Sequence, residues 1–154
     1  MPVHKQDMNQ WCWAAVSVMM IDQLGTPPSQ SQFVDYVKGS VVNETGTVTD
    51  MKKGLANWGL TSDTKIGTPL AFQTVASQIS NNQPIGTVIL WEDGSGGHAY
   101  AIRGYYEDTS RSKQDIYYID PWPDNADYNV MSYSNFVSNN SFHWVDSLFN
   151  VYVS

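Results

Sequence analysis

The chain has 154 residues, of which 15% are charged and 13% aromatic, and its formal net charge is −7 at pH 7. This length suits a single domain with a hydrophobic core of its own. The acidic balance, with no basic cluster beyond Lys52–Lys53, argues against nucleic acid as a partner and against a polybasic membrane contact. No apolar run approaches the roughly 20 residues of a membrane span, so we expect no membrane insertion.

The N-terminus and the cysteine content bear on the cellular compartment. Residues Met1 to Gln6 lack the pattern of a signal peptide. This leaves a cytosolic protein, or a protein whose leader or parent sequence is absent from this chain. The low charge favours a secreted or translocated protein. Cys12 is the one cysteine, which excludes an internal disulfide and makes it a candidate reactive thiol.

The first half of the chain, up to about residue 83, predicts helices. The first helix is expected to begin near Asn9 or Gln10 and to end at Gly25, with a buried face at helical spacing. A second is expected from Gln30 to Lys38, capped by Ser29. Further helices are predicted at residues 49–58 and at residues 69–79, the last with Thr68 as its cap and Pro69 in its first turn.

The second half predicts strands separated by tight turns. Apolar, β-rich runs span residues 85–91, 99–106, 115–119 and 142–153, and a short helical turn is expected at residues 134–137. The fold class is therefore α+β, in one domain. An N-terminal helical lobe at about residues 1–83 would pack on a C-terminal antiparallel β-sheet lobe at about residues 84–154.

Cys12 lies in the first turn of the first predicted helix. Unpaired backbone N–H groups and the helix dipole favour an anion there, so the position favours a thiolate. The alternative is a small buried core residue, which is the usual state of a free cysteine. The neighbouring residues distinguish the two readings.

The segment Gln6 to Ala15 (QDMNQWCWAA) resembles the nucleophile segment of the papain-like cysteine peptidases. That family has a Gln six residues before the Cys, and Cys-Trp-Ala opens its long helix. The resemblance implies that the Gln6 side chain and the Cys12 N–H both donate to one developing oxyanion, a strong source of transition-state stabilisation. Without it, Gln6 would be interpreted as an exposed loop residue.

A cysteine nucleophile needs a base, and the chain has three histidines. His4 belongs to the terminus, and His143 lies within the last apolar run as a strand residue. His98 follows a Gly-rich turn at the head of a strand. The stretch from His98 to Tyr105 (HAYAIRGY) resembles the base segment of the same family, in which His-Ala opens a strand that ends in Gly-Tyr. We therefore expect His98 to be the base.

The base needs an acceptor that orients its ring. Asp120 ends the next predicted strand, so two adjacent antiparallel strands would bring His98 and Asp120 together. Papain has Asn at this position and a shielding Trp two residues later; here the residues are Asp120 and Trp122. Asp is usual in smaller bacterial relatives, including peptidases that cleave bacteriocin leaders. The alternative for Asp120 is a turn residue before proline.

The resemblance implies a papain-like fold and a cysteine endopeptidase with Cys12, His98, Asp120 and Gln6 as catalytic residues. Trp11, Trp122 and Gly97 are the expected substrate-binding residues, the substrate a protein or peptide, and the protein a monomer. No metal or other cofactor is expected.

The core around Cys12 is more similar to the compact bacterial papain-like peptidases, among them effectors injected by plant pathogens, than to papain. Leader-cleaving peptidases typically have Asp-Cys-Gly instead, which argues against a double-glycine leader as substrate. Two other functions remain open. One is an amidase, deamidase or transglutaminase-like acyltransferase that uses the same triad, for example as a toxin domain, although cell-wall amidases typically carry Asp-Cys-Ser-Gly. The other is a binding domain without activity, which an epoxide inhibitor would separate by its failure to label Cys12.

A loop with Asp120, Asp124, Asn125 and Asp127 could hold Ca²⁺, but its spacing is not that of an EF-hand, and a solvated turn is preferred.

Overall fold

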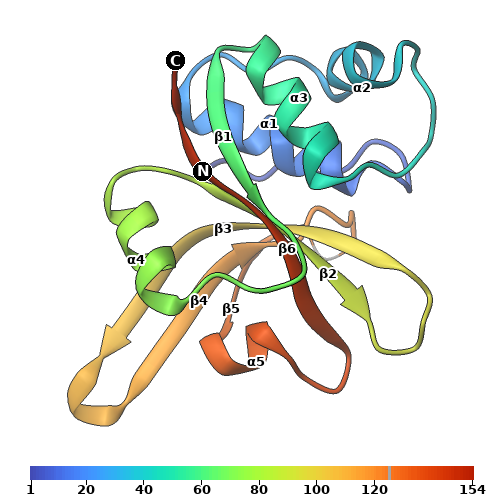
Figure 1. Cartoon of the computed structure of the whole chain (residues 1–154). Helices are drawn as coiled ribbons and strands as arrows, with labels where there is room; N and C mark the ends of the chain where they lie inside the picture. The colour runs from blue at the N-terminus through green and yellow to red at the C-terminus, as the bar shows by residue number, and fades with distance from the viewer. Residues whose placement is uncertain (125) are drawn as a thin grey trace.

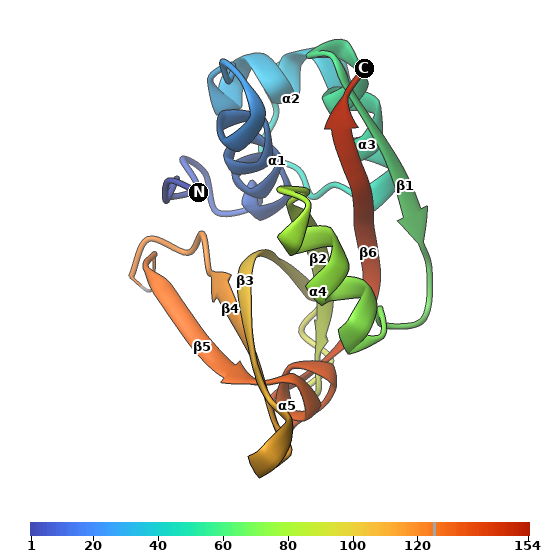
Figure 2. The same cartoon turned by 90° about the vertical axis from the view of Figure 1, so that its left-hand side faces the viewer.

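The computed structural model describes residues 1–124 and 126–154. In this part of the chain, six strands form one antiparallel sheet in the order β1-β6-β2-β3-β4-β5, and five α-helices surround it (Figure 1). Helices α1 (Cys12–Leu24), α2 (Gln30–Lys38) and α3 (Val48–Asn57) lie together at one end of the molecule (Figures 1 and 2). The α+β prediction is confirmed.

Helix α1 is the centre of the helical part. Every residue from Trp13 to Ile21 is buried, because α2, α3 and the sheet enclose the helix. This all-round burial explains why its sequence is apolar on every face rather than amphipathic. Within the described residues, no helix combines the length and apolar character needed to cross a bilayer.

Two capping boxes fix where α2 and α3 begin. Ser29 and Gln32 exchange side-chain to backbone hydrogen bonds at the start of α2, as predicted from Ser29. Thr47 and Asp50 do the same at the start of α3, one residue earlier than expected. Each box satisfies two backbone donors that a helix end otherwise leaves without partners.

The strands meet in a regular antiparallel ladder. β2 (Ile85–Trp91) lies between β3 (Gly97–Asp108) and β6 (Phe142–Val153), and β4 (Lys113–Ile119) continues the sheet beyond β3. β1 (Leu60–Lys65) and β5 (Tyr128–Ser132) form the two edges. A short 3₁₀ turn at Thr109–Arg111 connects β3 to β4.

The sheet has a hydrophobic core on each face. Ala99 and Ala101 face the core beneath α1, α2 and α3, whereas the alternate residues Tyr100 and Ile102 face a second core. Helix α4 (Phe72–Ser80) contributes Phe72, Val75 and Ala76 to the second core, and α5 (Tyr133–Val137) contributes Phe136. The cores therefore do not divide at residue 83, because α4 belongs with the β-sheet.

One predicted helix needs correction, and two strands of the structure are absent from the prediction. Helix α4 begins at Phe72 rather than at Pro69, because the chain is still extended at Ala71, and the Thr68 hydroxyl donates to the Pro69 carbonyl instead of capping. The strand β1 is not predicted, because its sequence is mostly polar and gives no strand signal. It forms by antiparallel pairing with β6. The short edge strand β5 was also not predicted; it pairs with β4.

The packing of α3 against α2 predicts the effect of an added methyl group. A Cβ on Gly54 would lie 2.1 Å from the Phe33 ring. Helix propensity favours Ala over Gly by about 1 kcal/mol, but overpacking a buried contact costs about 1–3 kcal/mol. We expect Gly54→Ala to lower the free energy of unfolding in urea, whereas Lys52→Ala on the exposed side of α3 leaves it nearly unchanged. A more stable Gly54→Ala protein would contradict this packing.

Candidate active site

Cys12 is the first residue of α1 and is partly exposed. Trp11 occupies the N-cap position, and no side chain among the described residues caps this helix end. The Cys12 side chain therefore lies at the positive end of the helix dipole, with no capping side chain beside it in the described part of the chain. The helix itself is held rigidly, since its next nine residues are buried.

His98 is the second residue of β3, the strand against which α1 packs. Its ring is stacked against Trp91 from the end of β2, with centroids 5.9 Å apart and an interplanar angle of 22°. The Tyr100 ring meets it edge-on at 5.2 Å. These two aromatic residues were not predicted as part of the site, although strand alternation places Tyr100 on the same side of β3 as His98.

Asp120 follows β4 and reaches the same ring. The pairing of Ala101 with Ile119 places Asp120 opposite Tyr100, so His98 is its diagonal neighbour on the same face of the ladder. The His98 Nε2 and Asp120 Oδ1 atoms lie 2.7 Å apart, with 11% and 14% of the two side chains exposed. The Trp122 N–H donates to the same carboxylate oxygen at 2.9 Å. The predicted meeting of His98 and Asp120 is thus present.

The His98 imidazole is held in its protonated form. Burial lowers its pKa, but hydrogen bonds with Asp120 and Cys12 and the charges of both residues outweigh this effect and raise the pKa to about 9. Because Nε2 faces Asp120, the Nδ1 atom is left for Cys12. Asp120 and Cys12 therefore both act on the His98 ring, and the Asp120 contact is a hydrogen bond.

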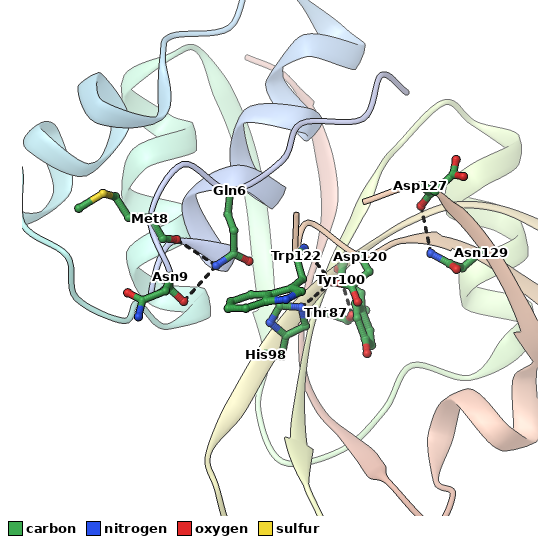
Figure 3. Close-up of polar contacts among 10 residues, drawn as sticks. All are labelled: Gln6, Met8, Asn9, Thr87, His98, Tyr100, Asp120, Trp122, Asp127 and Asn129. Carbon is green, nitrogen blue, oxygen red and sulfur yellow. Dashed lines mark hydrogen bonds and ion pairs between the residues drawn. The ribbon is translucent and has the colours of Figure 1, made fainter. Parts of the chain in front are cut away.

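Gln6 is fixed beside these residues by the N-terminal segment. Its backbone N–H donates to the Pro121 carbonyl at 2.9 Å, and 4% of the residue is exposed. The side-chain nitrogen lies 3.0 Å from the carbonyl oxygens of both Met8 and Asn9 (Figure 3). Gln30 of α2 fastens the segment further, because its amide bonds to the backbone of residues 5 and 7.

The three predicted substrate-binding residues differ in their surroundings. Trp122 is 38% exposed, and Gly97 is exposed at the start of β3 beside His98. Trp11 is only 2% exposed, and its indole N–H donates to the Val42 carbonyl at 2.8 Å. The prediction for Trp11 is therefore wrong, since its side chain lies in the core and presents no surface to a substrate.

The remaining histidines and the suggested calcium loop lie apart from this network. His4 pairs with Asp22 at 2.7 Å, and His143 pairs with Glu92 at 2.6 Å. Outside residue 125, the chain holds no group of three His, Cys, Asp or Glu arranged to bind a metal ion. Asn125 of the suggested loop lies outside the described residues.

Comparison with known proteins identifies the family. Residues 1–141 match the family described as papain-like cysteine protease AvrRpt2. The chain belongs to this family. It is accordingly a cysteine peptidase, and the suspected resemblance to papain-like peptidases is confirmed. No curated protein matches the sequence significantly.

Solved structures of papain-like peptidase domains share the fold. The peptidase domain of Streptococcus ComA, a bifunctional ABC transporter, superposes with a TM-score of 0.74 at 14% identity, over 99% of this chain and 98% of that one. A double glycine motif protease from an AMS/PCAT transporter, solved with its leader peptide, gives a TM-score of 0.60 at 16% identity, over 99% and 91% of the two chains. At such low sequence identities, the similarity shows only that the fold is shared.

The raised pKa of His98 can be measured in the wild-type protein and in a variant that lacks the Cys12 sulfur. We expect an NMR titration of the His98 ring to give a midpoint near pH 9 in the wild-type protein. In Cys12→Ala the midpoint should fall, because the hydrogen bond and charge of the sulfur are lost. A midpoint near the ordinary histidine value of about 6.5 in the wild type would contradict the proposed network.

The same shift predicts the pH dependence of stability. The folded protein holds the His98 proton more tightly than the unfolded chain does. The stabilisation is therefore complete below about pH 6.5 and is lost as the pH rises through about 9. The difference in unfolding free energy between wild type and His98→Ala, measured in urea, should shrink over this interval. A constant difference would argue against the shift.

Proposed function

We propose that the protein is a cysteine endopeptidase in which Cys12 is the nucleophile, His98 the general acid and base, and Asp120 the residue that orients His98. The observation that carries the proposal is the position of the His98 ring. One of its nitrogens lies 2.7 Å from an Asp120 oxygen, and both Asp120 and Cys12 raise the pKa of the ring. Nucleophile, base and orienting acceptor are thus supplied by α1, β3 and the end of β4.

The chemistry follows from the charges of this resting state. The Cys12 thiolate attacks the carbonyl carbon of the scissile bond, and its carbonyl oxygen becomes an oxyanion. The His98 imidazolium donates its proton to the leaving nitrogen, the C–N bond breaks, and an acyl group remains on Cys12. Neutral His98 then takes a proton from water, which attacks the thioester and releases the acid and the thiolate.

The oxyanion would be stabilised by the Cys12 backbone N–H and the Gln6 side-chain amide. Donors placed beforehand at this position are a large source of rate enhancement. The Gln6 nitrogen carries two protons and lies 3.0 Å from two carbonyl oxygens, those of Met8 and Asn9. Donation to the oxyanion therefore requires Gln6 to share or release one of these bonds when substrate is present.

A peptide or protein is the substrate class that fits this family. One structural neighbour is a protease in complex with a leader peptide. In this chain, the indole of Trp122 is exposed beside the His98–Asp120 bond, where it would shield that bond from water and contact the substrate. We also propose that the enzyme is a monomer and that it is secreted or translocated.

Replacement of the nucleophile is the first test. Cys12→Ala should abolish peptide cleavage and labelling by an epoxide inhibitor of papain-like enzymes, because no other thiol exists in the chain. Its melting temperature should stay near that of the wild type, since Cys12 is partly exposed at a helix end. Cleavage retained by this variant would end the cysteine-peptidase proposal.

Two substitutions of Asp120 separate orientation from structure. Asp120→Asn should keep measurable activity, because its side-chain oxygen still accepts from the His98 ring. Asp120→Ala should lose about 10²-fold or more in kcat/KM, on the scale of positioned acid–base catalysis. If Asp120 served only the turn before Pro121, both variants would cleave like the wild type and differ from it in melting temperature alone.

Removal of the Gln6 amide tests the oxyanion contact. We expect Gln6→Ala to lower kcat by about 10²-fold with a smaller change in KM, because an oxyanion donor acts in the transition state. Gln30→Ala is the control for loosening of the N-terminal segment, since Gln30 holds the backbone at residues 5 and 7. Equal losses in both variants would assign Gln6 a structural role instead.

A further inference from the structure

A cavity of about 210 Å³ lies on the Gln6 side of the candidate active site. One wall is the loop from Gln6 to Asn9, and the other is the turn formed by residues 122–124. The second wall begins two residues after Asp120, whose carboxylate bonds to His98. The cavity is thus continuous with the catalytic residues and, apart from Gln6 and Trp122, is made by side chains to which the proposed reaction assigns no role.

One buried atom at this cavity lacks a partner. The Gln6 side-chain oxygen is inaccessible to solvent and has no hydrogen-bond partner among the described residues, although Gln6 lines the cavity and is 4% exposed. The two carbonyl acceptors beside the nitrogen fix the orientation of the amide, because an exchange of oxygen and nitrogen would place three oxygens together. Figure 3 shows the free oxygen on the side of Trp122. An unsatisfied buried acceptor favours a ligand that donates.

The charges around the cavity have one sign. Asp7 and Asp124 are on opposite walls, and neither forms an ion pair with any described residue. Lys5 lines a neighbouring cavity that also includes Asp124, but their charged groups are not within the 4.0 Å of an ion pair. Trp122 and Met8 add apolar surface. Acceptors combined with an apolar wall suit a cation on an aliphatic stem.

The proposed mechanism indicates which part of a substrate reaches this cavity. His98 gives its proton to the leaving nitrogen, so the chain on the C-terminal side of the scissile bond departs past His98 and the neighbouring Trp122. We propose that this cavity binds a lysine or arginine side chain within the first two residues after the scissile bond, and that it thereby gives the enzyme a preference for basic residues there. This inference rests on the proposed peptidase function.

The bound side chain would make three kinds of contact. Its stem packs against the Trp122 indole, its charged end lies between the carboxylates of Asp7 and Asp124, and one N–H donates to the Gln6 oxygen, which a small rotation of the Gln6 amide exposes to the cavity. An acidic side chain would meet two like charges, and a neutral aliphatic one would leave the Gln6 oxygen without a donor. The same rotation loosens the bonds of the Gln6 nitrogen to Met8 and Asn9, so substrate binding and the oxyanion contact are coupled.

Binding can be tested without catalysis. Arginine amide and citrulline amide have nearly the same shape but differ in charge. We expect arginine amide at millimolar concentration to shift the Trp122 indole NMR signal of Cys12→Ala protein, with citrulline amide causing a much smaller shift. Asp7→Asn and Asp124→Asn, each made in the Cys12→Ala protein, should weaken the arginine response. Asp35→Asn on the exposed side of α2 is the charge-matched control. Equal responses to the two amides would overturn the proposal.

Cleavage supplies the second readout. In peptides that differ only after the scissile bond, arginine should raise kcat/KM over citrulline by about fivefold, the scale of exposed ion pairs, and less at high salt. Asp7→Asn and Asp124→Asn should reduce this preference, and Asp35→Asn should preserve it. Cleavage without any preference would overturn the cavity proposal and leave the peptidase proposal standing. Selective binding of arginine amide without cleavage of any peptide would do the reverse.

Discussion

The contact between the start of α1 and the start of β3 is the constraint on which the rest of the structure depends. It places a cysteine at a helix N-terminus against a histidine that is held by Asp120 at 2.7 Å. The burial of α1 fixes one partner, and the ladder of β3 with β4 fixes the other. Burial alone would lower the pKa of His98 and favour the neutral ring. The ring is protonated because the hydrogen bonds and charges of Asp120 and Cys12 raise that pKa.

The sequence predicts both the α+β fold and the meeting of His98 with Asp120. Cys12, His98 and Asp120 each stand at the end of an element, and element ends are marked by turns and glycines that the sequence displays. Strand alternation then brings His98 and Asp120 to one face. The prediction of Trp11 as a substrate-binding residue fails because proximity to Cys12 in the sequence does not give the direction of the side chain. The Trp11 indole lies in the core, whereas the neighbouring Cys12 acts on His98.

The missed elements share a physical cause. β1 has a polar sequence with few β-branched apolar residues, and it becomes a strand because β6 is long enough to pair with both β2 and β1. The later start of α4 reflects tertiary contacts, since Leu70 is buried and its carbonyl accepts a hydrogen bond from the Tyr133 hydroxyl at 2.6 Å. The burial and hydrogen bond of Leu70 outweigh the local preference for a helix start at Thr68 and Pro69. In α2 and α3 the capping boxes do mark the helix starts, because local and tertiary preferences agree there.

The rate of alkylation of Cys12 by iodoacetamide as a function of pH tests the central claim, that Cys12 and His98 rest as an ion pair. The thiolate is the reactive form, and a free cysteine has a pKa of about 8.5. In the wild type, the rate should show a step as the pH rises through about 9, where His98 loses its proton, and this step should be absent in His98→Ala. Superimposable profiles of the two proteins would contradict the ion pair.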